Sequence, residues 1–325
     1  MLNPKPKLYF ASSDNCSSPV SLALRCNEQQ TGLFTGCYLI YSWPVIESGP
    51  KKYDWTNVLA ELDLCEAFGL KAFLTLRDKR WVWFLKDKQT HAVPSDLLPI
   101  GEFQKLQQFT GTPAHWVRVA KRWDANVQAR YLDFLAEAGK VLSGHPALAA
   151  FEITETSLAY RKVEDLQEFG YPGAQEYTGI IKKYMLAAKH AFPTQDVLLA
   201  LNWIPGARSG SLGEHSILFE YGKNIGVGVS VTDIAPQNFP DYVDAVYSRF
   251  KAYKGQIPLA GKMERSSYRL WEPGRGHVGI DWVFQYLDNN LRLDYLVLQD
   301  DPMDAVSKIG FYESVLPYVK GWVKQ

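Results

Sequence analysis

The sequence predicts a single eight-stranded parallel barrel of the α/β class, the (β/α)8 TIM barrel, and three observations support this fold. Roughly eight short apolar runs alternate with segments that carry apolar residues at helical spacing, and eight such units close a parallel barrel. The runs are continuously apolar, as expected for parallel strands covered on both faces. No linker or shift in composition divides the 325 residues, so we expect one domain over residues 1–325.

The first half of the chain supplies four of the expected strands. KLYFAS (residues 7–12) and GCYLIYSW (36–43) are apolar runs of strand length. A helix is predicted over residues 55–70, where apolar residues recur at helical spacing and Gly69 stands near the end, and LKAFLTLR (70–77) follows it. The amphipathic pattern at 125–144 predicts a second helix, which leads into ALAAFEITE (147–155).

The second half repeats this alternation. A helix predicted at 176–192 precedes the strand DVLLALNW (196–203), and IGVGVSVTD (225–233) is the next apolar run. A helix at 239–255 precedes IPLAGKMER (257–265), and one at 281–293 precedes DYLVLQDD (294–301). A last helix is predicted at 305–322.

Two features remain outside the repeating pattern. The segment after the first strand, ASSDNCSS, is not the glycine-rich phosphate loop that an open doubly wound sheet would place there, so we favour the barrel. The stretch from residue 78 to about residue 123 is long and does not repeat the pattern. Loops of this length are usually functional or disordered, and in a barrel this one lies on the C-terminal rim.

Charge and composition exclude several classes of protein. Lysine plus arginine equals aspartate plus glutamate at 35 each, which argues against a nucleic-acid partner. No apolar stretch is long enough to span a bilayer, so no membrane partner is expected. The N-terminal residues lack the apolar core of a signal peptide, so the chain is cytosolic or follows a removed signal; of these we favour a secreted or periplasmic location. The sequence does not determine the oligomeric state.

The four cysteines lie in the first fifth of the chain, at spacings that do not match zinc sites. A bridge between Cys16 and Cys26 is possible, whereas the apolar surroundings of Cys37 and Cys65 favour buried free thiols. The six histidines form no HxH or HExxH pair, so neither a metal nor another cofactor is expected.

Two of the predicted strands end in glutamates. Glu155 closes ALAAFEITE, the fourth strand, and Glu264 closes IPLAGKME, the seventh. Active sites of such barrels are built at the C-terminal ends of the strands. Glycoside hydrolysis commonly needs two carboxyl groups that flank the scissile bond, so this pair predicts such chemistry.

In these features the chain resembles clan A of the retaining glycoside hydrolases, whose barrels carry catalytic glutamates on the fourth and seventh strands. RYLDFLAEAGKVLSGHPALAAFEITE and GCYLIYSW with its following YDW carry the resemblance, which covers most of the chain. It implies that Glu155 is the general acid/base, that Glu264 is the nucleophile, and that the substrate is a β-linked carbohydrate. The long rim loops favour an oligo- or polysaccharide.

The chain departs from the clan's pattern at three places. Thr154 stands where the clan usually has an asparagine before the acid/base, VTD replaces a tyrosine on the sixth strand, and VLQDD replaces a tryptophan on the eighth. These departures motivate an alternative, a barrel that binds carbohydrate without cleaving it. A barrel lyase or isomerase acting on sugar acids is the other alternative.

Strand alternation places charged residues near the predicted nucleophile. Lys262 shares a face with Glu264, so both point into the barrel if either does. Glu152 is the candidate counter-charge for Lys262, because a buried lysine needs one. Arg77, at the end of the third strand, is positioned to keep Glu264 ionised.

Further substrate-binding candidates lie at or near the strand ends. Aromatic rings can stack on the C–H faces of sugars, and carboxylates or amides can bind their hydroxyls. These candidates are Trp43, Asn202, Trp203, Asp233, Trp271 and Gln299, together with Arg77 and Glu152. Basic residues gather after the third and seventh strands, which makes an anionic polysaccharide a candidate substrate.

Overall fold

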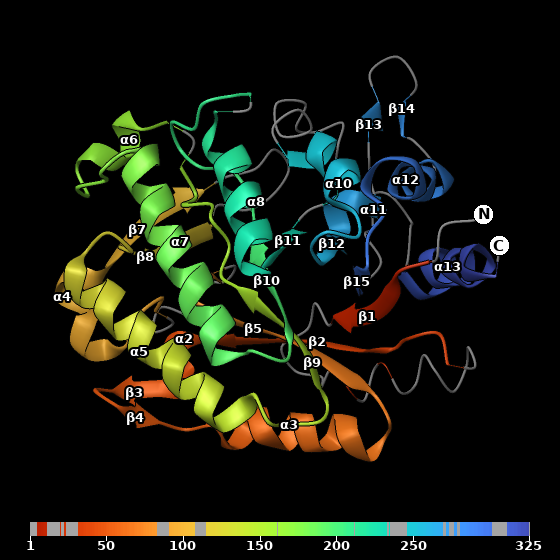
Figure 1. The fold of residues 1–325 in the computed structure, drawn as a ribbon, viewed down its shortest axis with the longest axis horizontal. Helices are drawn as coiled ribbons and strands as arrows, with labels where there is room; N and C mark the ends of the chain where they lie inside the picture. The colour runs from red at the N-terminus through yellow and green to blue at the C-terminus, as the bar shows by residue number, and fades with distance from the viewer. Residues whose placement is uncertain are drawn as a thin grey trace.

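The computed structural model describes residues 5–11, 20, 23, 32–82, 91–107, 115–160, 162–210, 212–232, 234, 246–268, 271–272, 276–277, 280–300 and 311–324. Eight parallel strands within these ranges close a barrel, which confirms the predicted fold (Figure 1). In chain order they are β1 (Lys7–Ala11), β2 (Gly36–Ser42), β5 (Lys71–Arg77), β9 (Leu148–Ile153), β10 (Asp196–Ala200), β11 (Gly228–Val231), β12 (Leu259–Met263) and β15 (Tyr295–Gln299). Each pairs with its successor, and β15 returns to β1 to close the ring.

Helices cover the outside of the barrel, and Figure 1 shows α5, α7 and α8 side by side. The helical elements are α3 (Thr56–Ala67), α5 (Ala125–Leu142), α7 (Ala174–Ala191), α8 (Glu214–Ile225), α10 (Ser248–Tyr253), α12 (Ile280–Tyr286), the π-helical turns η4 (Leu287–Leu291) and η5 (Phe311–Val315), and α13 (Leu316–Val323). Asp124 caps α5 by accepting hydrogen bonds from two backbone N–H groups of its first turn. Helix α8 was not predicted from the sequence, and residues 239–245 of the helix predicted at 239–255 lie outside the described ranges.

The barrel interior has an apolar layer beneath a polar one. The apolar layer consists of Tyr9, Ala11, Tyr38, Phe73, Ala150, Leu198, Ala260, Tyr295 and Val297. Two positions further along three of these strands, on the same face, follow Thr75, Glu152 and Lys262, and all three are buried. The polar layer therefore lies toward the C-terminal ends of the strands, directly below the position of Glu264.

The long segment between β5 and α5 is not a simple loop, which corrects the sequence-based expectation. It folds into an antiparallel sheet of β6 (Lys79–Val82), β8 (His115–Ala120) and β7 (Glu102–Gln107), which we call the rim sheet. The 3-10 turn η2 (Ser95–Leu97) and helix α4 (Leu98–Gly101) belong to the same segment. Its strands are short and, in the part of the chain that the structure describes, pair with one another and not with the barrel, so the sequence showed no repeated apolar pattern there. Because the segment leaves the C-terminal end of β5, it brings the start of β6 to the barrel mouth.

The remaining elements are short connections: α2 (Trp43–Ile46), the hairpin of β3 (Glu47–Gly49) and β4 (Lys52–Tyr53), α6 (Glu164–Gln167), α11 (Arg265–Tyr268), and the pair β13 (Trp271–Glu272) and β14 (Gly276–His277). Among the described residues, none of the helices combines the length and the apolar character that crossing a membrane requires.

Two cysteine predictions can be compared with the structure. Cys37 on β2 and Cys65 on α3 are buried thiols that form no disulfide, as predicted. A hydrogen bond between their thiols, together with burial, raises the pKa of Cys37 far above its usual range. Cys16 and Cys26 lie outside the described residues.

Candidate active site

The two predicted catalytic carboxylates lie at the same end of the barrel. Glu155 follows the fourth strand, β9, and Glu264 follows the seventh strand, β12, with β10 and β11 between them. The side chain of Glu155 is 19% exposed and that of Glu264 is 33% exposed, so both remain accessible from the barrel mouth.

Two donors hold the carboxylate of Glu155. Lys79, the first residue of the rim sheet, places its Nζ 3.1 Å from Oε2, and Asn202 places its Nδ2 2.5 Å from Oε1. Lys79 also donates to Ser157 Oγ at 3.1 Å, and Asn202 also donates to Thr232 Oγ1 at 2.9 Å. Residues that follow the two neighbouring strands, β5 and β10, therefore fix the position of this one carboxylate.

Asn202 is itself fixed by its backbone and its neighbours. Its N–H donates to Thr156 Oγ1 at 2.8 Å, and that hydroxyl donates to the carbonyl oxygen of Asn202 at 2.8 Å. His215 Nε2 lies 3.2 Å from the same carbonyl. Burial lowers the pKa of His215, so the ring is neutral near pH 7 and its Nε2–H donates to this carbonyl. With the backbone of Trp203 donating to its Oδ1 at 2.7 Å, the amide of Asn202 is oriented with its NH2 group toward Glu155.

A buried ion pair lies behind the Glu155 side of the site. Arg122, which is fully buried, donates from Nε and Nη2 to the two carboxylate oxygens of Asp78, at 2.7 Å each. Thr154 donates to Asp78 Oδ1 at 2.6 Å and is 1% exposed. The Thr154 side chain is therefore buried and hydrogen-bonded to Asp78. The amide that contacts Glu155 comes instead from Asn202.

Glu264 lies among cations of the polar layer. Lys262 forms an ion pair with it, as their shared strand face predicted. Burial lowers the pKa of Arg77. Tyr38 and the carboxylates of Glu152 and Glu264 raise that pKa by more than burial lowers it, so the net shift is upward. Arg77 therefore stays protonated beside Glu264 and favours its ionised form.

Two predicted substrate-binding residues need correction. Glu152 is 4% exposed and accepts a short hydrogen bond from Tyr38, so it belongs to the interior and not to a sugar-binding surface. It was also expected to pair with Lys262, whose ion pair joins Glu264. Trp43 is fully buried, with Nε1 donating to Glu47 Oε2 at 2.7 Å and its ring stacked on Phe134. Trp43 is the first residue of α2, directly after β2, and its ring packs against Phe134 of α5 instead of facing the mouth of the barrel.

The other predicted binding residues fall into two groups. Asn202, Trp203 and Gln299 lie at the C-terminal ends of β10 and β15 and are partly buried. Within the described part of the chain, Gln299 Oε1 has no hydrogen-bond partner although it is buried. Asp233 lies outside the described residues, and for Trp271 the structure gives the backbone of β13 but not the side chain.

The sequence did not single out Lys79, Asp78 or Arg122. In the sequence Lys79 was one of several basic residues in a segment interpreted as a loop. Nothing in its local sequence indicated that the rim sheet would place it beside Glu155. Asp78 and Arg122 lie at the two ends of the same segment. Only the folding of that segment brings them together.

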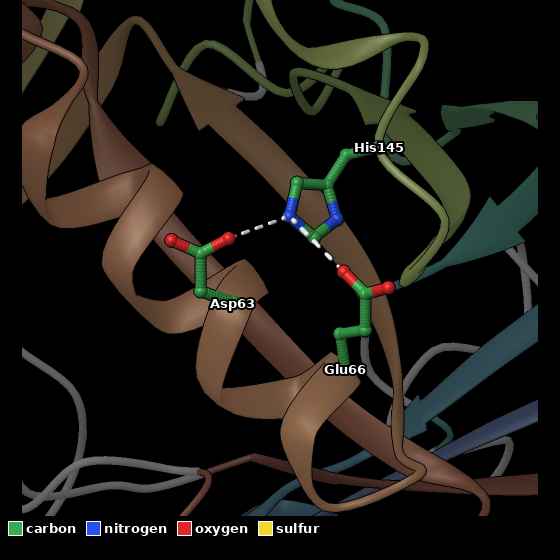
Figure 2. Close-up of side chains that lie close together, drawn as sticks. All are labelled: Asp63, Glu66 and His145. Atoms are coloured by element: carbon green, nitrogen blue, oxygen red, sulfur yellow. Dashed lines mark hydrogen bonds and ion pairs between the residues drawn. The ribbon is translucent and has the colours of Figure 1, made fainter.

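One group of side chains among the described residues has the composition of a metal site (Figure 2). His145 Nε2 lies 3.1 Å from Asp63 Oδ1 and 3.9 Å from Glu66 Oε2. The backbone N–H of Ala147 donates to Nδ1 at 3.2 Å, so the proton of the neutral ring is on Nε2 and points at the carboxylates. A metal on Nε2 would require the proton on Nδ1, facing another N–H, whereas metal-bound histidines place an acceptor there. The group is a polar contact between α3 and the turn before β9, at the barrel end opposite Glu155.

No protein-family model matches the chain, and no curated protein does so either. Solved structures share its fold. The catalytic domain of a β-amylase from Paenibacillus polymyxa superimposes with a TM-score of 0.60 at 10% identity, over 91% of this chain and 92% of that one. Endo-glycoceramidase II from Rhodococcus sp. gives 0.60 at 11% identity, over 97% and 78%. A β-1,4-D-mannanase from Cryptopygus antarcticus gives 0.54 at 13% identity, over 99% and 91%.

These three neighbours are glycoside hydrolases, and the barrel that the resemblance to such enzymes implied is confirmed. At identities of 10–13% the likeness establishes the shared fold. Activity has to be argued from the residues at the mouth of this barrel.

Proposed function

We propose that the protein hydrolyses β-glycosidic bonds of an oligo- or polysaccharide with retention of anomeric configuration. The observation that carries the proposal is the placement of Glu155 and Glu264. They are partly exposed carboxylates at the ends of the fourth and seventh strands of one closed barrel. Glu155 is held by Lys79 and Asn202, which follow the neighbouring strands β5 and β10, and Glu264 is held by Lys262 of its own strand.

The contacts suggest a distinct role for each carboxylate. Glu264 lies beside Lys262 and Arg77, whose positive charges favour the ionised form that a nucleophile needs. It would attack the anomeric carbon while Glu155 gives a proton to the leaving oxygen. Water would then attack the glycosyl-enzyme and lose a proton to Glu155, which releases the sugar and restores Glu264. Asn202 keeps the carboxylate of Glu155 oriented through both steps.

The test is incubation with a panel of polysaccharides and measurement of new reducing ends. We expect Glu155→Gln and Glu264→Gln each to abolish the activity, whereas Glu137→Gln leaves it unchanged. Glu137 is a matched control because it lies on α5 and forms a solvent-exposed pair with Lys140. Proton NMR of the first product determines whether configuration is retained. Binding without cleavage would instead indicate a carbohydrate-binding barrel, and unsaturated products would indicate a lyase.

The rim sheet supports the narrower proposal that the substrate is anionic. Arg80, Arg118 and Gln104 are cross-strand neighbours on one face of this sheet, and Arg80 donates to Ser42 at the end of β2 at 3.4 Å. Arg118 and Lys121 line a cavity of about 480 Å³ together with the rings of Phe103 and Phe169 and with Glu102, whose carboxylate lies 3.9 Å from Arg118 Nη1 and offsets part of its charge. Adjacent strands lie about 4.8 Å apart, so the three side chains Arg80, Arg118 and Gln104 span about 10 Å across the rim sheet, from the barrel mouth toward this cavity.

Uronate-containing and neutral polysaccharides of similar linkage separate this proposal from the first one. We expect higher kcat/KM for the anionic substrate and a decrease with added salt, because exposed charges are screened beyond about 10 Å at 0.1 M salt. Arg80→Gln should raise KM for the anionic substrate without a comparable effect on a neutral one. Equal loss on both substrates would contradict an anionic preference while leaving hydrolysis intact.

A further inference from the structure

Lys79 is a buried ammonium in direct contact with the predicted acid. Its side chain is 3% exposed, and its Nζ lies 3.1 Å from both Glu155 Oε2 and Ser157 Oγ. The pairing of Lys79 with Val119 in the rim sheet fixes the backbone that presents this side chain. The contact is thus built into the fold and is not a chance pairing of flexible surface groups.

Burial and two nearby guanidinium groups favour release of the proton from Lys79. Burial lowers its pKa, the carboxylate of Glu155 opposes this, and the positive charges of Arg122 and Arg77 lower it again, so the net direction is downward. Asp78 offsets part of the Arg122 charge through their ion pair, and the buried hydroxyl of Tyr177 contacts Arg122 on its other side. The ammonium of Lys79 is therefore less stable than that of an exposed lysine.

Glu155 has the opposite requirement. Lys79 and Asn202 donate to its two carboxylate oxygens, yet a general acid must carry a proton when the leaving group departs. Transfer of one proton from Lys79 Nζ to Glu155 Oε2 converts a largely buried ion pair into a neutral amine and a neutral acid. Such a transfer removes two charges from a poorly solvated place, where keeping them is costly.

We propose that Lys79 and Glu155 share one proton, and that Lys79 is the source of the proton that Glu155 passes to the leaving oxygen. This inference rests on the proposed glycosidase function. In the first step the proton moves from Lys79 to Glu155 and on to the leaving oxygen, as the C–O bond breaks and Glu264 bonds the anomeric carbon. In the second step the attacking water gives a proton to Glu155, which returns it to Lys79. The sum of both steps is the addition of one water to the bond.

Leaving-group dependence separates this role from a structural one. The experiment uses two glycosides of the sugar that the wild-type protein cleaves: an alkyl glycoside, whose leaving oxygen needs a proton, and a dinitrophenyl glycoside, which departs without one. Lys79→Arg keeps the positive charge but holds its proton permanently, since the guanidinium does not deprotonate in proteins. We expect kcat/KM for the alkyl glycoside to fall by about 10²- to 10⁴-fold, the usual contribution of a general acid. For the dinitrophenyl glycoside we expect less than about a tenfold change.

Lys79→Met gives an independent reading through the pH profile. In the wild-type protein the alkaline limb of kcat/KM reports loss of the shared proton from the pair. Without Lys79, activity on the alkyl glycoside requires Glu155 to hold its own proton. The alkaline limb should therefore move to lower pH by more than about one unit, because a carboxyl group loses its proton well below the pH at which an ammonium does.

A control variant and two defined outcomes distinguish failure of the shared proton from failure of the proposed function. Lys71→Arg is the same substitution at the first residue of β5, where Lys71 donates to the carbonyl of Pro146 at the surface, and it should change neither measurement. Equal losses on both glycosides in Lys79→Arg, together with an unmoved alkaline limb in Lys79→Met, would overturn the shared proton and leave Lys79 a purely structural residue. If the wild-type protein cleaves no glycoside, the proposed function itself fails, which is a separate result.

Discussion

Replacing Asp78 by asparagine should destabilise the protein strongly. Asp78 accepts two hydrogen bonds from Arg122 at 2.7 Å each and one from Thr154 at 2.6 Å. The guanidinium of Arg122 is completely buried, so Asp78→Asn leaves a positive charge in the interior without its counter-charge.

Two estimates of the loss in the free energy of unfolding agree. Removing one partner of a buried ion pair costs about 3–5 kcal/mol. Hydrogen bonds to charged groups contribute about 1.5–3 kcal/mol each, and two of them are weakened here. We therefore expect the free energy of unfolding to fall by about 4 kcal/mol.

Urea unfolding followed by tryptophan fluorescence and circular dichroism measures this change. Thr154→Val is the graded control: it removes the hydrogen bond that Thr154 donates to Asp78 and the 3.2 Å one that it accepts from Arg122, and it should cost about 1–2 kcal/mol. The double variant Asp78→Leu with Arg122→Met removes both charges and should recover much of the loss, since apolar replacements of buried pairs are often neutral. A loss below about 1 kcal/mol in Asp78→Asn would refute the reasoning, because it would mean that the Arg122 charge is solvated or paired elsewhere.

Two further predictions concern the core and the pH dependence of stability. Trp43→Ala should cost about 3–5 kcal/mol in thermal or urea unfolding. It should leave the KM of any substrate unchanged at temperatures where the protein stays folded, and a selective rise in KM would restore Trp43 as a sugar-stacking residue. Because burial lowers the folded-state pKa of His215 below its ordinary value of about 6.5, the unfolded chain takes up a proton that the folded chain does not as pH falls below that value. Stability should therefore decrease below about pH 6.5, and less steeply in His215→Gln; urea midpoints at pH 7 and pH 5 that change equally in both proteins would contradict this.

The sequence predicted the barrel because the barrel repeats. Parallel strands covered on both faces have continuous apolar sequences, and the helices that cover them repeat apolar residues every 3.6 positions. Both patterns can therefore be recognised in a short stretch of sequence. The order of the strands then follows from the chain, since each pairs with its successor. From that order alone, residues 155 and 264 fall at the ends of the fourth and seventh strands.

Where the local pattern was weak, the sequence-based interpretation failed. The rim sheet was interpreted as a loop, because short strands such as Lys79–Val82 carry no strong periodicity and pair only after the segment has folded. Trp43 looked like a residue at a strand end and hence at the mouth. The short helix α2 instead turns its ring into the core against Phe134.

By itself the sequence determined the number and order of the strands, the ends at which the two glutamates stand, and the face that Lys262 shares with Glu264. Only the tertiary structure decided which groups touch those glutamates. Lys79 and Asn202 lie 76 and 47 positions from Glu155 along the chain, and local periodicity contains no information about contacts at such separations. Those contacts depend on how the rim sheet and the ends of neighbouring strands close over the barrel, because side chains distant in the sequence meet only when the packing of the whole fold is complete.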